Sequence, residues 1–335
     1  MKLKVTAPNR IDLAGGTLDI WPLYAFLGGG YTVNAAISMC SEAQIETRTD
    51  GKFDIRADDI DEAQCADSLE ALDPTGQVDL IVRVLKVYKP KVGLTIRTRC
   101  HAPKGTGLGS SSSLVIALSA GLLAIEGRSL DDGELIDIAA NIEAELLVVP
   151  TGKQDYWAAA RGGVNAIWFG MEETTCEPLI VDDAVRQELN DRLVLSFTGE
   201  TRFSGTSNWN MVKAYIDDVG QTRKNLQIIK RSSNEMRECL LQGDFDAFAQ
   251  ALGNEWEARK LLAEGVTTPC IDSLMAKAAE AGALASKICG AGGGGCMISF
   301  CKPGAREQVE ATLEREGAPV LPYTIRPECV LVEEI

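Results

Sequence analysis

The chain has 335 residues, of which 45% are hydrophobic, and carries a formal net charge of −15. Its length exceeds one average domain and its apolar content suffices for substantial cores, so we expect two packed units with a shared cleft. The negative charge is a repulsive background for nucleic acid and for anionic membrane surfaces, which excludes both as expected partners.

Location and redox state follow from the apolar runs and the cysteines. The longest apolar runs are too short to span a bilayer, and the N-terminal MKLKVTAPNR lacks the apolar core of a signal peptide. A cytoplasmic location is therefore expected, with the ten scattered cysteines reduced, since no Cys-x-x-Cys pair is present. The single histidine, His101, argues against a structural Cys/His zinc site and against a Ser-His-Asp triad.

Hydrophobic periodicity predicts a first half that mixes strands and helices, followed by a mostly helical stretch. Strands are expected at 3–8, 31–39, 42–49, 52–58, 92–100, 162–169 and 192–199, and helices at 78–88, 114–125 and 131–149. Residues 206–264 are expected to be helical, with Gly243 and Asp244 as a stop and a restart. After Pro269 we expect a helix, a glycine loop, a strand, a helix and a final strand. The pattern changes near residue 190 from mixed strands and helices to mostly helices. This change predicts two domains, 1–190 and 191–335.

The stretch APKGTGLGSSSSL at 102–114 lies between a predicted strand and a predicted helix. Residues 92–100 before it alternate apolar and polar side chains, and the run of helix formers after it begins with serines that can cap free N–H groups. A glycine turn that opens a buried helix gathers backbone N–H groups at the positive end of the helix dipole. We therefore interpret the stretch as an anion site, most naturally for phosphate. A flexible linker and a purely structural turn are the alternatives.

A second glycine cluster, CGAGGGGC at 289–296, tests a rival nucleotide-binding interpretation. Gly290, Gly292 and Gly295 satisfy the G-x-G-x-x-G pattern, which in dinucleotide-binding folds lies between a strand and a helix. Here a strand follows the glycines, and the chain also has no G-x-x-x-x-G-K-[ST] loop. A dehydrogenase is therefore disfavoured, and a tight packing turn is the alternative role for this cluster.

Two further stretches carry charged groups. RIDLAGGTLD at 10–19 places Arg10, Asp12 and Asp19 around a small-residue turn, and Glu143 precedes Asp155 by twelve residues. Taken singly, such charges fit a solvated surface. Lys153 and Asp155 differ from this pattern, because their neighbours in the sequence are glycine and aromatic residues and not further charged residues.

Together these stretches resemble the motifs of the GHMP kinase family (galactokinase, homoserine kinase, mevalonate kinase, phosphomevalonate kinase). PKGTGLGSSSSL at 103–114 is similar to the family's phosphate loop, P-x-G-x-G-L-G-S-S. RIDLAGGTLD falls where the sugar-kinase members have their first motif, and GAGGGG at 290–295 falls where they have their third. The resemblance covers nearly the whole chain. It implies an α+β fold with a ribosomal-protein-like N-terminal domain, a ferredoxin-like C-terminal domain, and ATP and acceptor in the cleft between them.

Within the family, GGTLD at 15–19 and GKQDYWAAARGG at 152–163 most resemble kinases of anomeric sugar hydroxyls, especially the heptose 7-phosphate kinases. Those kinases commonly read G-K-Q-D-Q-Y-A-A, so Tyr156 and Trp157 depart from the pattern. Galactokinases and mevalonate kinases carry G-E-H in the first motif, where this chain has Gly-Gly-Thr. The resemblance implies an ATP- and Mg²⁺-dependent kinase of a sugar or sugar phosphate, such as a heptose 7-phosphate, that acts on a hydroxyl, in particular the anomeric one. A kinase of a non-sugar alcohol such as mevalonate and an inactive ligand-binding member are the alternatives.

The resemblance also assigns site residues. Asp155 would be the catalytic carboxylate, paired with Arg10, and Lys153 is a further catalytic candidate. Glu143 would bind Mg²⁺ together with Ser110 or Ser111. The ATP phosphates would lie on Pro103, Gly105, Thr106, Gly107, Leu108, Gly109, Ser110, Ser111 and Ser112. The acceptor would contact Gly16, Thr17, Asp19, Arg202, Gly292 and Gly293.

A second phosphate group on the acceptor is predicted from the cations near the assigned site. Lys153 and Arg161 flank Asp155, and Arg202 lies in a Gly/Ser/Thr-rich stretch at 197–209. In a chain of net charge −15, cations combined with hydroxyl and backbone donors favour a site for a phosphate remote from the anomeric hydroxyl. Arg202 as a solvated loop residue is the alternative.

Overall fold

The computed structural model describes residues 1–103, 105–179, 182–200 and 204–335. The first part of the chain contains β1 (Lys2–Ala14), α1 (Leu23–Phe26), β2 (Gly30–Arg48), β3 (Phe53–Ala57), β4 (Glu62–Ala66), α2 (Asp79–Tyr88), β5 (Gly93–Cys100), α3 (Ser110–Ile125), α4 (Asp132–Leu147), α5 (Gln154–Arg161), β6 (Val164–Phe169) and β7 (Thr174–Pro178). The second part contains α6 (Asp183–Arg192), β8 (Leu193–Phe197), α7 (Ser204–Ile216), α8 (Thr222–Gln242), α9 (Phe245–Arg259), α10 (Pro269–Ala281), β9 (Ala283–Ile288), β10 (Cys296–Cys301), α11 (Arg306–Arg315) and β11 (Leu331–Glu334).

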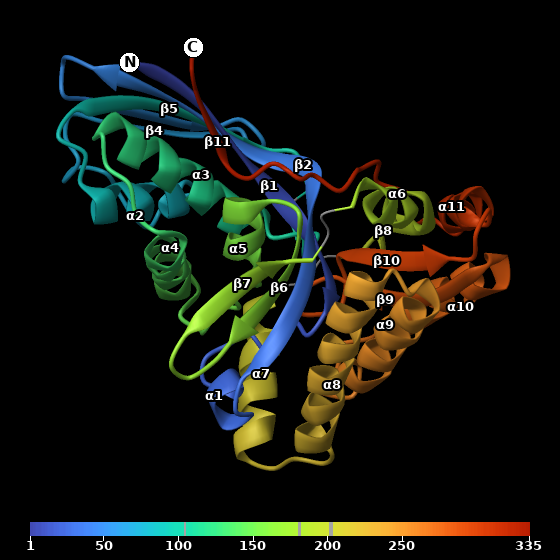
Figure 1. Ribbon diagram of the computed structural model, residues 1–335. Helices are drawn as coiled ribbons and strands as arrows, with labels where there is room; N and C mark the ends of the chain where they lie inside the picture. The colour runs from blue at the N-terminus through green and yellow to red at the C-terminus, as the bar shows by residue number, and fades with distance from the viewer. Residues whose placement is uncertain (104, 180–181, 201–203) are drawn as a thin grey trace.

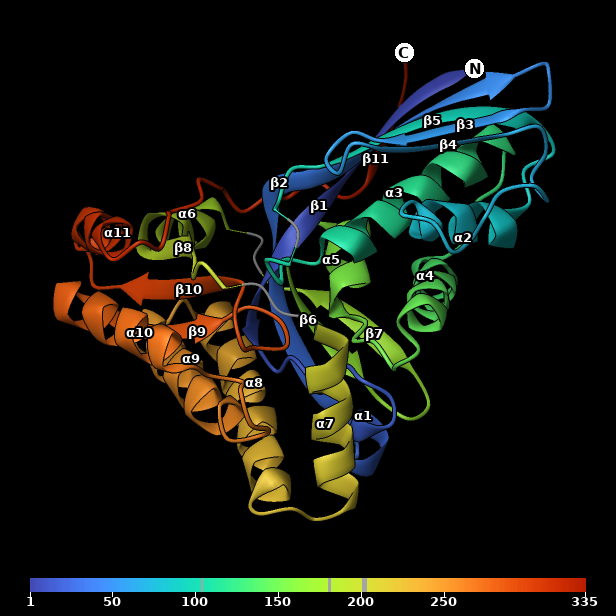
Figure 2. The ribbon, with the colours of Figure 1, turned by 180° about the vertical axis from the view of Figure 1, so that it is seen from behind.

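Two sheets organise the described residues. An eight-stranded sheet has the order β11-β1-β2-β5-β3-β4, with β6 paired to β2 and β7 to β6, and a three-stranded sheet has the order β8-β10-β9. Helices α2, α3, α4 and α5 lie on one side of the larger sheet (Figure 1). Helices α8, α9 and α10 lie on one side of the smaller sheet, and α6 and α11 lie on the other (Figure 2). No helix of the described ranges is both long enough and apolar enough to cross a membrane.

The two long strands β1 and β2 pair with each other and are the longest strands of the larger sheet. The sequence predicted two strands at 31–39 and 42–49, and this is wrong because β2 runs unbroken over 30–48. Its first half pairs with β6 and its second half with β5, while β1 pairs along almost its whole length. The register of β1 against β2 shifts between Pro8 and Asn9, next to a proline that lacks a backbone N–H.

The remaining elements largely match the periodicity, with some omissions. Gly243 ends α8 in the left-handed conformation and Asp244 caps α9 through its side chain, which confirms the predicted stop and restart. The sequence did not predict α1, β4, α5, β7, α6 or β9. The expected last strand is confirmed as β11, but it pairs with β1 and so completes the first sheet. The domain division at residue 190, inside α6, stays a prediction.

A buried cluster of four charges, which we name the charge cluster, joins the two parts of the chain. It comprises Asp12 on β1, Glu255 and Arg259 on α9, and Lys287 on β9, all with no exposed side-chain surface. The Lys287 Nζ lies 3.1 Å from Asp12 Oδ2 and 3.3 Å from Glu255 Oε2. Burial alone would raise the pKa of Asp12, but the positive charges of Lys287 and Arg259 outweigh it and lower that pKa.

Removing one member of the charge cluster should destabilise the fold. Lys287→Met keeps most of the length of the side chain but leaves two buried carboxylates facing one cation, so the free energy of unfolding should fall by about 3–5 kcal/mol. Chemical denaturation measures this loss. The exposed Lys277, which pairs with Glu280 on α10, provides the matched control, and Lys277→Met should leave stability almost unchanged. Equal effects of the two substitutions would contradict the assigned role of the cluster.

Candidate active site

A cleft of about 740 Å³ lies where the glycine loop of the first part meets the glycine cluster of the second. It gathers the start of α3, the turn after β1, the start of α5 and the loop between β9 and β10. Of the residues that the sequence assigned, those lining the cleft are Arg10, Gly16, Thr17, Asp19, Gly105, Thr106, Gly107, Leu108, Gly109, Ser110, Ser111, Ser112, Glu143, Asp155 and Gly292. Most of the predicted site is therefore brought together in one place.

The glycine loop ends in the first turn of α3. Gly109 occupies the N-cap position with a φ of 75°, a left-handed conformation that favours glycine. The expected serine cap is wrong, because Ser111 and Ser112 donate to Glu143 and Ser113 donates to Asn9. Helix geometry leaves the first N–H groups of α3 without intrahelical acceptors, so they remain suited to binding a phosphate group.

The two glycine clusters pack directly against each other. The Cys296 N–H donates to the Thr106 carbonyl at 2.7 Å, and a Cβ on Gly295 would lie 2.6 Å from that oxygen. A Cβ on Gly107, whose φ is 72°, would lie 2.7 Å from the Cys289 carbonyl. The second cluster is thus a tight packing turn, and Gly292 also lines the cleft. Gly293 is not among the described lining residues, and its N–H donates to the Val266 carbonyl.

Arg10 on β1 connects three parts of the cleft. Its Nε and Nη2 lie 2.7 and 2.6 Å from Asp155 Oδ1, and its Nη1 donates to the Gly107 carbonyl at 2.6 Å. Its backbone N–H donates to the Leu108 carbonyl at 3.0 Å. Burial raises the pKa of Asp155, and the Arg10 guanidinium opposes that shift. The predicted pairing of Arg10 with Asp155 is present, with the carboxylate held beside the glycine loop.

Glu143 on α4 is a buried carboxylate surrounded by hydroxyl groups. Ser111 donates to its Oε1, while Ser112, at 2.8 Å, and Tyr156 donate to its Oε2. Burial raises the pKa of Glu143, and these hydroxyl donors oppose the shift. Carboxylate and hydroxyl oxygens are hard ligands of the kind that Mg²⁺ takes, so Glu143 and Ser111 fit the metal role that the sequence assigned.

Asp19 lies deep in the cleft beside the start of α5. Its Oδ2 accepts from the Gln154 N–H at 3.0 Å, and a Cβ on Gly152 would collide with its carboxylate. Burial raises the pKa of Asp19 to about 6, although the Gln154 N–H opposes this shift. On the turn before it, Arg259 donates to the Gly16 carbonyl and, at 3.0 Å, to the Thr17 hydroxyl. Arg259 thus connects the charge cluster to the turn at Gly16 and Thr17, which the sequence predicted to contact the acceptor substrate.

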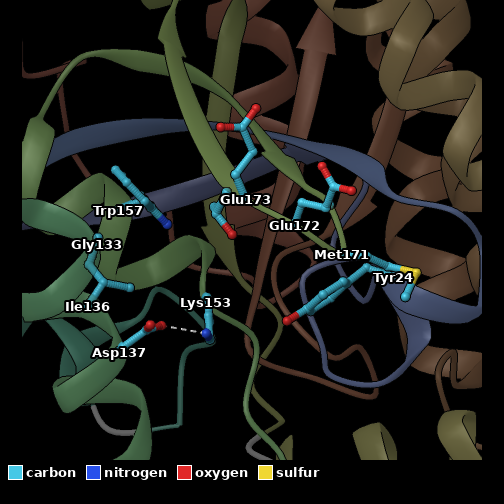
Figure 3. A pocket seen from close by; sticks show the side chains of 11 residues that line it. Tyr24, Gly133, Ile136, Asp137, Lys153, Trp157, Met171, Glu172 and Glu173 are labelled. Carbon is cyan, nitrogen blue, oxygen red and sulfur yellow. Dashed lines mark hydrogen bonds and ion pairs between the residues drawn. The ribbon is translucent and has the colours of Figure 1, made fainter.

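Two of the predicted cations, Lys153 and Arg161, do not line this cleft. Lys153 forms an ion pair with Asp137 at 2.6 Å and lines a separate pocket of about 260 Å³ with Tyr24, Trp157 and Met171 (Figure 3). Arg161 forms an ion pair with Asp132. Arg202 lies outside the described residues. The catalytic role of Lys153 and the second phosphate site stay predictions.

Several side chains that shape the cleft were not assigned from the sequence. The amide Nδ2 of Asn9 donates to the Ser110 hydroxyl at 2.7 Å, Tyr156 donates to Glu143, and Arg259 holds the turn at Gly16. Asn9 is adjacent to Arg10 and Tyr156 is adjacent to Asp155, so proximity to assigned residues was the available signal. Nothing in the sequence pointed to Arg259, since it lies in a helix far along the chain and next to no assigned residue.

The raised pKa of Asp19 predicts a pH-dependent gain in stability on substitution. Between pH 4 and 6 the folded state binds a proton at Asp19 that the unfolded state, with a pKa near 3.8, has released, so this group makes stability fall as pH rises. Asp19→Asn removes the effect, and its stability relative to the parent should rise by roughly 2.4 kcal/mol from pH 4 to pH 7. Denaturation of both proteins across this range measures the difference, and a constant difference would contradict the buried, raised-pKa environment.

Comparison with known proteins places the chain in a family. The model described as GHMP kinases N terminal domain matches residues 79–163, and the model described as GHMP kinases C terminal matches residues 236–319. These matches include the glycine loop, α4 and α5 in the first part and the second glycine cluster in the other. The expected two-domain α+β architecture of this family is confirmed.

Individual proteins agree with the family models. The D-glycero-alpha-D-manno-heptose 7-phosphate kinase of Campylobacter jejuni is 30% identical over 98% of this chain and 98% of its own. The mevalonate kinase of Methanothermobacter thermautotrophicus is 29% identical over 72% of this chain and 75% of its own. The crystal structure of a D-glycero-D-manno-heptose 1-phosphate kinase from Bacteroides thetaiotaomicron superposes with a TM-score of 0.81, at 28% identity over 99% of both chains. The chain belongs to the GHMP kinase family, whose members are ATP-dependent phosphotransferases.

Proposed function

We propose that this sugar kinase transfers the γ-phosphoryl group of ATP to the anomeric hydroxyl of a sugar phosphate, with a heptose 7-phosphate as the first candidate. The observation that carries the proposal is the partly buried Asp155 carboxylate, which Arg10 holds against the glycine loop at the start of α3. The full-length similarity to the heptose 7-phosphate kinase of Campylobacter jejuni supports the choice of acceptor.

Asp155 has the environment of a group that orients and deprotonates a hydroxyl. Phosphoryl transfer requires the attacking oxygen to be placed in line and its proton to be accepted. Burial raises the pKa of Asp155 and so makes its carboxylate a stronger base, while the Arg10 ion pair keeps it charged and fixed in direction. An anomeric hydroxyl is more acidic than an ordinary alcohol, which lowers the demand on this base. Asp19, which lies beside the start of α5 in the same cleft, would accept a hydrogen bond from another sugar hydroxyl.

The donor side is formed by the glycine loop and α3. The backbone N–H groups at the start of α3 and the helix dipole attract the ATP phosphates. Ser111 and Glu143 would hold Mg²⁺, which supplies positive charge to the phosphates when it is bound. The described residues contain no group of three or more His, Cys, Asp or Glu side chains suited to hold a metal. A small protein ligand set agrees with the preference of Mg²⁺ for one or two carboxylates completed by substrate phosphates and water.

One alternative acceptor is favoured by a specific comparison. The mevalonate kinase of Methanothermobacter thermautotrophicus is nearly as similar, though over 72% of this chain, so a non-sugar alcohol is the second candidate. An inactive ligand-binding member is disfavoured, because Arg10, Glu143 and Asp155 all converge on the cleft. A cytoplasmic location and the lack of nucleic-acid or membrane partners stay predictions.

A panel assay of ADP release decides between these acceptors. Heptose 7-phosphate, hexose phosphates, the unphosphorylated sugars and mevalonate are each supplied with ATP and Mg²⁺. The proposal expects the highest kcat/KM with a terminal sugar phosphate, and phosphorus NMR of the product should show the new phosphate coupled to the anomeric proton. Preference for mevalonate, equal use of an unphosphorylated sugar, or a phosphate at another carbon would each contradict the proposal.

Substituting Asp155 separates chemistry from binding. Asp155→Asn keeps the shape but removes the charge and the proton acceptor, so kcat should fall by about 10²- to 10⁴-fold with little change in KM for either substrate. Steady-state kinetics measures the two effects. Asp67, an exposed carboxylate paired with Lys52 and not among the residues lining the cleft, gives the control, and Asp67→Asn should stay within a few fold of the parent. A kcat for Asp155→Asn as high as that of the control would rule out Asp155 as the catalytic carboxylate.

A further inference from the structure

We propose that Tyr156 is a positioning residue that fixes the orientation of the Glu143 carboxylate for metal binding. The inference rests on the proposed function, because it concerns the metal that accompanies ATP. It assigns a role to a residue at which the sequence departs from the pattern of the kinases that it resembles, and for which neither the motifs nor the comparisons give a function.

The contact is direct and wholly buried. Tyr156 has no exposed surface, and its hydroxyl donates a hydrogen bond to Glu143 Oε2. Ser112 donates to the same oxygen at 2.8 Å, so Oε2 is held from two directions. The other oxygen, Oε1, accepts from Ser111, which lines the cleft. The carboxylate therefore has one oxygen, Oε2, held by the two donors Tyr156 and Ser112, and one oxygen, Oε1, that accepts from the cleft-lining Ser111.

This arrangement distinguishes the roles of the two oxygens. A carboxylate with two free oxygens can rotate and bind a metal in several ways, whereas hydrogen bonds to one oxygen leave the other as the preferred ligand. Ser111 is on the Oε1 side, so the hydroxyl and the carboxylate oxygen are placed to meet one ion together. Tyr156 is not among the described residues that line the cleft, so it would act through Glu143.

The place of Tyr156 on α5 links this carboxylate to the acceptor side. Asp155 and Tyr156 are adjacent, and successive residues of a helix point about 100° apart. Asp155 therefore faces Arg10 and the cleft, while Tyr156 reaches across to Glu143 on α4. The Tyr156 ring is anchored in the core of the first part. A single turn of helix thus sets both the carboxylate for the acceptor and the one for the metal.

Tyr156→Phe tests the inference, because it keeps the ring and removes only the donor. The first readout is binding. A non-hydrolysable ATP analogue is expected to raise the melting temperature in the presence of Mg²⁺, and the measured quantity is the Mg²⁺ concentration at which half of this rise is reached. Loss of a group that orients a metal ligand typically weakens metal affinity by about 10- to 100-fold, so this concentration should rise at least about tenfold. In kinetics, saturating Mg²⁺ should restore kcat to within a few fold, and the acceptor KM should hardly change.

Tyr323→Phe is the matched control, since Tyr323 is also a buried tyrosine and donates to the Leu193 carbonyl away from the cleft. It should leave the Mg²⁺ dependence unchanged. If Tyr156→Phe does not fold, Ser112→Ala removes the other donor to Oε2 and should raise the same Mg²⁺ requirement. An unchanged requirement in a folded Tyr156→Phe or Ser112→Ala protein, or a kcat that excess Mg²⁺ fails to restore, overturns the inference. A parent protein whose stabilisation by the nucleotide needs no Mg²⁺ would instead contradict the proposed function.

Discussion

The geometry of the cleft depends on one buried cation, Arg10. Its guanidinium binds the Asp155 carboxylate on α5 and the Gly107 carbonyl in the glycine loop, and its backbone N–H binds the Leu108 carbonyl. The carboxylate that we assign to the acceptor and the loop that we assign to ATP are therefore both positioned from β1. Because phosphoryl transfer requires little covalent chemistry from the protein, the relative placement of these two groups is the main contribution that the fold makes.

The second part of the chain contributes by fixing the opposite wall of the cleft. The charge cluster connects β1 with α9 and β9, and Arg259 extends it to the turn at Gly16 and Thr17. Buried ion pairs are weak evidence for stability, since apolar residues of similar volume often serve as well. A cation and a carboxylate must meet at a defined position, however, so the cluster sets one arrangement of the two sheets. The direct packing of the two glycine clusters completes that arrangement where the ligands are expected to lie.

The sequence predicted the features that local pattern determines. The glycine loop before α3 and the helical stretch over 206–264 with its break at Gly243 depended on motif and period. The pairing of Arg10 with Asp155 was implied by the resemblance to the family. It did not predict that β2 is a single strand, because only its partners on both sides make it continuous. It also misassigned the serines as caps, since their acceptor, Glu143, comes from another helix. Contacts such as that of Arg259 with Thr17, 242 residues apart, leave no periodic signal.

The central claim is that Arg10 and Asp155 act as one unit in the transfer step, and a double-mutant cycle on kcat tests it most directly. Arg10→Met and Asp155→Asn are measured singly and together, with circular dichroism to verify that each protein is folded. Groups that act as a unit have strongly non-additive effects, so the account predicts a double variant within about threefold of the slower single variant. If instead the two losses multiply, the residues act independently, and the account of the cleft as a site organised by Arg10 is contradicted.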